Sequence, residues 1–267
     1  MNKKIGFIGA GKMAQAMIAG MVKSNVIPRE NIIASAATEY TLQQIEQIYG
    51  ISTTLDNKEV AKIADIVILA VKPDIHESVI NEIKNEMKNT AIIVTIAAGI
   101  TLQELIRYFG RPIKAIRTMP NTPALVEEGM SVICANEQLS EEEIAEVEEL
   151  FQCFGKTERM SEKLMDAVPA ISGSSPAYVY LLLEAMADGG VRQGIPRDQA
   201  YRLAAQAVLG AAKMVLETGK HPGELKDQVC TPGGATIEAI ATLEREQFRG
   251  AILAAMESCT NKVTTLS

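Results

Sequence analysis

The sequence of 267 residues predicts an α/β protein in two domains, and three observations indicate this fold class. Short apolar runs alternate with amphipathic helical patterns through the first part of the chain. One of these runs leads directly into a glycine-rich turn. From about residue 161 the β-branched runs end and small residues dominate, as in packed helices. We therefore predict a nucleotide-binding first domain over residues 1–160 and an all-helical second domain over residues 161–267.

The glycine-rich turn follows the apolar residues Ile5, Phe7 and Ile8, and residues 9–14 read Gly-Ala-Gly-Lys-Met-Ala. G-x-G-x-x-A is the dinucleotide fingerprint at the first strand-to-helix turn of a Rossmann unit. Gly9 permits the tight turn, and Gly11 lets the backbone approach a pyrophosphate. The alternative is a plain structural turn. We favour nucleotide binding because strand and helix patterns continue to alternate after it.

The other elements of the first domain follow in order. Strands are predicted at residues 32–34, 51–54, 65–71, 91–96, 114–119, 131–135 and 156–160. A surface helix is expected through His76, and Ser140 with Glu143 forms a capping box for the last helix. The strand over 65–71 is almost continuously apolar, which indicates that both of its faces are covered.

Ligands bind at the carboxyl ends of parallel strands, so the residues after each strand are candidates. Residues 70–73 form a candidate cofactor wall, although Lys72 can equally be a solvated loop lysine. The small residues 97–99 would let a flat ring approach. Residues 120–123, Pro-Asn-Thr-Pro, form a stiff loop at another strand end. This loop either holds polar groups in position for a ligand or is a structural turn, and the structural turn is slightly favoured.

The end of the second strand bears on the choice of cofactor. An NAD-binding unit carries an acidic residue there, which bonds the ribose 2′-hydroxyl. Ser35 and the three residues after it include no acid, although Glu39 follows and no arginine is close. This pattern favours NADPH, with NADH as the alternative.

The second domain is predicted to be helical and shared between two subunits. One helix starts at Ser175-Pro176 and is expected to stop at Gly189-Gly190, and another starts at Pro196. The alanine-rich helices of this domain have more apolar surface than one isolated helical hairpin could cover. A dimer is therefore favoured over a monomeric bundle packed on the first domain. A turn at Gly233-Gly234 opens a further helix, and it is either a receptor for a carboxylate or a helix start with nothing bound.

Composition excludes several classes of function. A net charge of −7 and a pI near 5.1 argue against binding nucleic acid or an anionic membrane, and no segment is long enough to span a bilayer. Four scattered cysteines without a C-x-x-C fit a reducing cytoplasm. Only two histidines are present and no ligands cluster, so no metal site is expected.

Several motifs together resemble the pyrroline-5-carboxylate reductase family over essentially the whole chain. They are Ala-Val-Lys-Pro at 70–73, Met-Pro-Asn-Thr-Pro at 119–123, Ser-Gly-Ser-Ser-Pro-Ala-Tyr at 172–178, Ala-Asp-Gly-Gly-Val at 187–191, His-Pro-Gly at 221–223 and Pro-Gly-Gly-Ala-Thr at 232–236. The resemblance implies reduction of Δ1-pyrroline-5-carboxylate to proline with NAD(P)H, the last step of proline biosynthesis. It also implies an interlocked homodimer, which some members assemble into decamers.

The resemblance assigns site residues by position. Around the cofactor it implies Ile8, Gly9, Ala10, Gly11, Lys12, Met13, Ser35, Asn57, Ala70, Val71, Lys72, Pro73 and Ala97. For the substrate carboxylate it implies Thr231, Gly233, Gly234, Ala235 and Thr236, with Thr236 near the ring nitrogen as the catalytic candidate. Two positions depart from the family pattern. Gln228 stands where many members have Asn, and Pro169 where Thr is common.

Imine reduction suits this sequence better than carbonyl reduction. A carbonyl needs an acid such as His or Lys in the cleft, whereas a cyclic imine can carry its own proton. One enzymatic rival is a β-hydroxyacid dehydrogenase-like protein, which would need a catalytic lysine such as Lys213 or Lys226. A rival of another class is a catalytically silent NADP-binding sensor or assembly protein.

Overall fold

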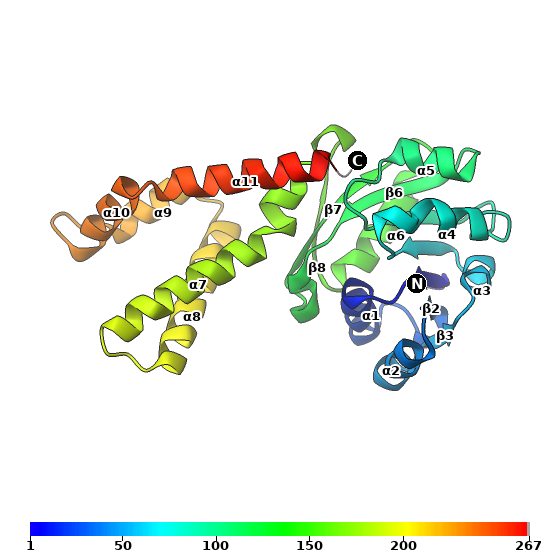
Figure 1. Ribbon diagram of the computed structural model, residues 1–267, viewed down its shortest axis with the longest axis horizontal. Coiled ribbons are helices and arrows are strands. Elements are labelled where there is room, and N and C mark those ends of the chain that lie inside the picture. Colours follow the sequence, from blue (N-terminus) through cyan, green and yellow to red (C-terminus); the bar gives the residue numbers. More distant parts are fainter. Residues whose placement is uncertain (266–267) are drawn as a thin grey trace. The chain divides into compact units, whose positions relative to one another are not determined.

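The computed structural model describes residues 1–265, which divide into two compact units. Met1–Ser174 and residues 259–265 form the first unit, and Ser175–Ser258 form the second (Figure 1). The predicted fold class is confirmed, because the N-terminal part is a Rossmann-type α/β unit and the C-terminal part is helical. The predicted boundary between residues 160 and 161 stays a prediction.

One sheet of eight strands organises the first unit. The strands are β1 (Ile5–Ile8), β2 (Ile32–Ser35), β3 (Ser52–Thr54), β4 (Ile66–Leu69), β5 (Ile92–Thr95), β6 (Lys114–Met119), β7 (Gly129–Ala135) and β8 (Gly155–Arg159). Their order is β3-β2-β1-β4-β5-β6-β7-β8, and among the described strands only the β6–β7 pair is antiparallel. The chain runs from β1 to β3 in one direction and returns to β4 on the other side of β1. The carboxyl ends of β1 and β4 therefore flank the switch point at which such sheets bind ligands.

The helices of the first unit cover the sheet. They are α1 (Lys12–Ser24), α2 (Glu39–Tyr49), α3 (Asn57–Ile63), α4 (His76–Ile83), α5 (Leu102–Phe109) and α6 (Glu141–Gln152). The expected capping box is present at α6, where Ser140 accepts from the Glu143 amide and Glu143 accepts from the Ser140 amide. The strands β1, β2, β4 and β5 are buried along their whole length. Apolar packing on both faces thus fixes the sheet that carries the candidate site.

The second unit contains helices only. They are α7 (Ser175–Arg192), α8 (Arg197–Thr218), α9 (Pro222–Val229), α10 (Ala235–Arg245) and most of α11 (Phe248–Thr264). The expected stop of α7 at Gly189-Gly190 is wrong, because the helix continues to Arg192. A Cβ at Gly190 would lie 3.2 Å from the Cβ of Ala200 on α8. The second glycine therefore serves close helix packing, and the chain turns later, at Gly194 with its φ of +92°.

Candidate functional site

The fingerprint turn uses its two glycines for different purposes. Gly9 has a φ of +94°, and a Cβ there would lie 2.6 Å from the carbonyl oxygen of Ala70. Gly11 precedes α1 with a φ of −69°, and a Cβ there would meet no described atom within 4 Å. The first glycine is therefore required by the fold itself. The second leaves open space at the start of a helix, where a phosphate group can approach the backbone.

The start of α1 fits an anion. Gly11 has no side chain to cap the helix, so it leaves the first backbone N–H groups without that partner. Lys12 is exposed at this helix start, and the side chain of Gln15 donates to the Ala10 carbonyl, 2.9 Å away, which fixes the loop. Exposed amides, helix dipole and a lysine all favour a pyrophosphate at this position.

Ser35, the last residue of β2, lies against Asn57, the first residue of α3. The buried Ser35 hydroxyl donates to Asn57 Oδ1 at 2.7 Å. Asn57 Nδ2 in turn donates to Glu82 Oε2 at 3.0 Å. The sequence singled out the first two residues but missed Glu82, which lies 25 residues after Asn57. A carboxylate thus lies beside the pair of residues expected near a 2′-phosphate.

The loops after β4 and β5 are joined by a buried histidine. Ala70 to Pro73 follow β4, and Ala97 follows β5, its parallel neighbour. His76 lies 3.0 Å from the Lys72 carbonyl oxygen through Nδ1 and 3.0 Å from Thr95 Oγ1 through Nε2. The Ala97 amide donates to the same Thr95 hydroxyl oxygen at 3.2 Å. The two candidate cofactor loops are therefore held by one chain of hydrogen bonds.

His76 lies on the surface helix expected there, α4, whose Glu77 and Ser78 are exposed, but its own side chain faces the core with an exposed fraction of 0%. Burial lowers the pKa of its imidazole below the ordinary 6.5, and this outweighs the opposite effects of the Lys72 carbonyl and Asp74. The side chain of Lys72 is itself exposed. Its backbone carbonyl, not its ammonium group, is what the fold holds in place.

The stiff loop over residues 120–123 has a structural role in the described chain. Asn121 Nδ2 donates to the Ser172 carbonyl at 3.0 Å, and Asn121 Oδ1 accepts from the Met130 amide at 2.9 Å. The Ser172 carbonyl belongs to a single π-helical turn, Pro169–Gly173, which Pro169 begins. Both ends of this buried amide are thus used to connect backbone segments.

The second glycine-rich turn precedes α10 in the helical unit. Gly233 has a φ of +68°, and the Gly234 amide donates to the Thr231 carbonyl at 3.0 Å. Gly234 is the residue before the helix and has no side chain to cap it. Thr236 lies in the first helical turn and is half-buried. This turn therefore repeats the open helix start found at α1, with a hydroxyl beside it.

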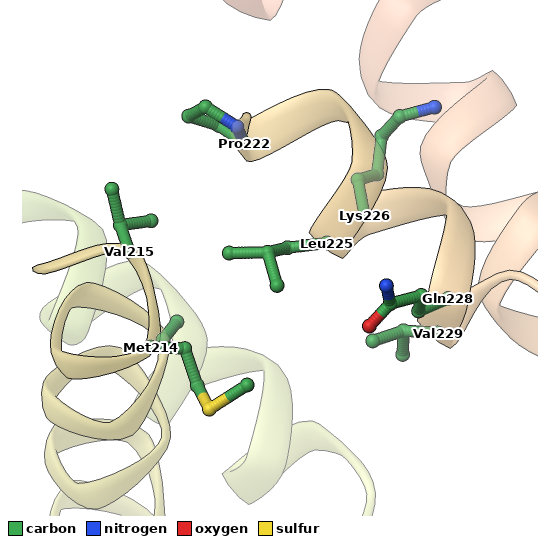
Figure 2. A pocket seen from close by; sticks show the side chains of 8 residues that line it. Met214, Val215, Pro222, Leu225, Lys226, Gln228 and Val229 are labelled. Carbon is green, nitrogen blue, oxygen red and sulfur yellow. The ribbon is translucent and has the colours of Figure 1, made fainter. Parts of the chain in front are cut away.

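The helical unit also contains an apolar pocket between α8 and α9 (Figure 2). It is lined by Ala211, Met214, Val215, Pro222, Leu225, Lys226, Gln228 and Val229. Gln228, one of the two departures from the family pattern, donates from Nε2 to Glu224 Oε1 at 3.0 Å. The lysines that a hydroxyacid dehydrogenase-like reaction would need are both paired with carboxylates; Lys213 is exposed and Lys226 is half-buried. Lys226 lies 2.7 Å from Asp227, and Lys213 lies 3.4 Å from Glu217.

The chain matches two family descriptions. "Pyrroline-5-carboxylate reductase dimerisation" matches residues 162–266, and "NADP oxidoreductase coenzyme F420-dependent" matches residues 4–99. A pyrroline-5-carboxylate reductase from Escherichia coli K12 is 47% identical over 267 residues, 100% of this chain and 99% of that protein. One from Arabidopsis thaliana is 42% identical over 264 residues, covering 99% of this chain and 95% of the relative.

Solved structures of similar proteins cover the chain as completely. A pyrroline-5-carboxylate reductase from Coxiella burnetii superimposes with a TM-score of 0.93 at 32% identity, covering 100% of this chain and 99% of that one. A pyrroline carboxylate reductase from Plasmodium falciparum, solved with NADP bound, superimposes with a TM-score of 0.90 at 32% identity, covering 99% and 98%. The likeness therefore extends over both the sheet and the helical region.

Proposed function

This chain belongs to the pyrroline-5-carboxylate reductase family, and on that premise we propose that it reduces Δ1-pyrroline-5-carboxylate to L-proline with NADPH, the last step of proline biosynthesis. The observation that carries the proposal is the pair of glycine-rich turns, one before α1 and one before α10. Neither turn has a side chain that caps its helix. Each offers backbone N–H groups to an anion, one to a pyrophosphate and the other to a small carboxylate.

The cofactor is held by the first unit in this proposal. The residues around it are Ile8, Gly9, Ala10, Gly11, Lys12, Met13, Ser35, Asn57, Ala70, Val71, Lys72, Pro73 and Ala97. The open space at Gly11 and the absence of an acid in β2 fit NADPH, with NADH as the alternative. When bound, the dinucleotide supplies a hydride.

The substrate is held by the turn before α10, through Thr231, Gly233, Gly234, Ala235 and Thr236. Backbone amides at this helix start receive the ring carboxylate. The Thr236 hydroxyl aligns the ring nitrogen by a hydrogen bond and is too weak an acid to serve as the proton source. Its contribution is orientation of an imine that arrives already protonated.

The titratable groups of the described chain favour an imine over a carbonyl. Both ring nitrogens of His76 are occupied by protein partners, so it has no proton to give to a substrate. His221 Nδ1 accepts from the Gly223 amide at 3.0 Å and caps α9. An iminium substrate needs no such acid, because it is electrophilic before the hydride arrives.

The protein acts as an assembly of identical subunits, which is what the dimerisation match indicates. We propose a homodimer built by the helical unit, with a decamer as the larger alternative. We also propose a cytoplasmic location, because Cys134, Cys153, Cys230 and Cys259 are all free thiols. Among residues 1–265, no helix is long and apolar enough to cross a membrane.

One assay tests the proposed function against its rivals. Loss of NADPH absorbance is followed with pyrroline-5-carboxylate and, in parallel, with a panel of 2-oxo acids and 3-hydroxy acids. We expect turnover with the cyclic imine only, and proline as its product. Turnover with a hydroxy acid instead would favour the dehydrogenase-like rival, and NADPH binding without any turnover would favour the silent sensor.

A further inference from the structure

We propose that His76 is a positioning residue that fixes the two cofactor loops relative to each other, by joining the Lys72 carbonyl to the Thr95 hydroxyl and, through it, to the Ala97 amide. The inference rests on the proposed function, because it assumes that these loops meet the cofactor. It concerns a residue outside the expected site, buried and distant in sequence from Thr95 by 19 positions.

We call this chain of hydrogen bonds, from the Ala97 amide through Thr95 and His76 to the Lys72 carbonyl, the relay. The direction of each hydrogen bond follows from which groups can donate and which can only accept. A backbone carbonyl only accepts, so the proton of a neutral His76 lies on Nδ1 and is donated to Lys72. Nε2 is then an acceptor, and the Thr95 hydroxyl must donate to it. The Thr95 oxygen is left free to accept from the Ala97 amide. The relay therefore runs in one direction, from the Ala97 N–H to the Lys72 carbonyl.

The relay spans two neighbouring strands at the edge where ligands bind. Lys72 follows β4 and Ala97 follows β5, and these strands are parallel partners. Each loop contributes backbone atoms to the candidate cofactor wall. Holding a carbonyl of one and an amide of the other at fixed positions pre-organises that wall before the cofactor arrives, which reduces the entropy lost on binding.

Thr95 offers a sharper test than His76, because its shape can be kept while its chemistry changes. Thr95→Val removes the donor to His76 and the acceptor for Ala97 with little change in volume. We expect it to weaken NADPH binding about tenfold, which is the size expected when a buried hydrogen bond is lost. Thr95→Ser keeps the hydroxyl and should restore binding to within about threefold of the wild type.

Thr118→Val is the matched control. Thr118 is also buried, and its hydroxyl also donates a hydrogen bond, to the Thr95 carbonyl at 3.0 Å. It lies on the next strand and is not part of the relay. If Thr95 and Thr118 merely stabilise the sheet, both valine variants should lower the melting temperature and neither should change the NADPH dissociation constant. The relay predicts that only Thr95→Val changes it.

Nitrogen-15 NMR of ring-labelled histidine reads the relay without any assay of activity. We expect His76 to carry its proton on Nδ1, whereas neutral His221 should carry it on Nε2, since its Nδ1 accepts from Gly223. The variant His221→Gln leaves a single ring and assigns the signals. A His76 with a bare Nδ1 would overturn the proposed direction.

The outcomes separate the relay from the proposed function. Wild-type protein that does not bind NADPH would overturn the proposed function. NADPH binding that is equal in the wild type and in Thr95→Val would overturn the relay and leave the function intact. A tenfold loss in Thr95→Val that Thr95→Ser restores and Thr118→Val does not reproduce would support the relay.

Discussion

The two units of this chain treat their apolar residues in opposite ways. In the first, the strands β1, β2, β4 and β5 are entirely buried between helices. In the second, Ala187, Ala200 and Ala204 are the only buried residues among those described, and all three are alanines. Large side chains of this unit, such as Leu253 at 67% and Leu216 at 80%, remain exposed within a single copy of the chain.

The difference shows where each unit obtains its stability. A sheet covered by its own helices buries enough apolar surface to fold as one body. Helices that expose most of their leucines gain little free energy from apolar burial until another surface covers them. The dimerisation match over residues 162–266 indicates that the helices associate with another chain. In the proposed homodimer a second copy of the same helices would cover this surface, and folding and assembly of the second unit would be one process.

The largest predicted effect comes from adding charge to an exposed leucine of the helical unit. Leu253→Glu in α11 should weaken the dimer by about 3–6 kcal/mol, because a buried leucine contributes about 1.5–3 kcal/mol and the change occurs in both subunits. Sedimentation velocity over a range of concentrations measures it. Ile48→Glu in α2 is the matched control, since Ile48 is 65% exposed but belongs to the first unit. A dimer unaffected by Leu253→Glu would mean that this face is solvated.

A second comparison separates fold from function inside the first unit. Gly9→Ala should lower the free energy of unfolding by about 2–4 kcal/mol, because the φ is positive and a Cβ lies 2.6 Å from the Ala70 oxygen. Gly11→Val should leave that free energy within about 0.5 kcal/mol and abolish NADPH binding, because its side chain enters the space left for the pyrophosphate.

Urea unfolding and NADPH titration of these two variants test this contrast. We expect Gly9→Ala to change the free energy of unfolding and Gly11→Val to change NADPH binding. If Gly11→Val unfolds as easily as Gly9→Ala, the open space at Gly11 is not a ligand site. If it binds NADPH normally, the proposed place of the cofactor is wrong.

The helical unit should contain one site, the half-buried Thr236, that acts in catalysis and not in assembly. Thr236→Ala should lower kcat/KM. The ratio of kcat/KM in the wild type and the variant should correspond to a loss of about 1–3 kcal/mol of transition-state stabilisation, the range for one hydrogen bond to a positioned polar group. The sedimentation coefficient and the NADPH dissociation constant should stay unchanged. Thr242→Ala, six residues later on the same helix, is the control. Equal kinetics in both variants would move the substrate away from this turn.

The sequence predicted the sheet better than the helices, and the reason is physical. Apolar runs such as 65–71 mark a strand covered on both sides, a property of the strand itself. In the helical unit the starts expected at Ser175-Pro176 and at Pro196 are confirmed, but the signal for a helix end misled. Gly189-Gly190 has the composition of a helix stop, yet Gly190 lies inside α7 because Ala200 of α8 packs closely against it.

The candidate site was predictable only in its backbone-driven parts. A glycine fingerprint constrains the turn directly, which is why Gly9 and Gly11 could be interpreted without a structure. Side chains that meet between elements distant in sequence leave no such local signal. Glu82 of α4 lies beside Asn57 of α3, and His76 of α4 lies beside Thr95 of β5, at separations of 25 and 19 residues. The periodicity around His76 indicated a helix but not that this residue faces the core.

The smallest predicted effect is a pH dependence of stability from that buried histidine. Burial holds the pKa of His76 below its ordinary 6.5, so the unfolded chain takes up a proton at a higher pH than the folded chain does. Stability from this group is therefore fully present above pH 6.5 and falls as the pH drops toward the lowered folded-state pKa. The slope for one proton is at most about 1.4 kcal/mol per pH unit.

Most carboxylates titrate near or below about pH 4.3, outside the range from 6.5 to 5 in which His76 is examined. Urea unfolding across that range should show the slope in the wild type and a shallower one in His76→Phe, which cannot take up the proton. Equal slopes in the two proteins would mean that the imidazole is protonated as readily in the folded chain as in the unfolded one, and that its burial does not keep it neutral.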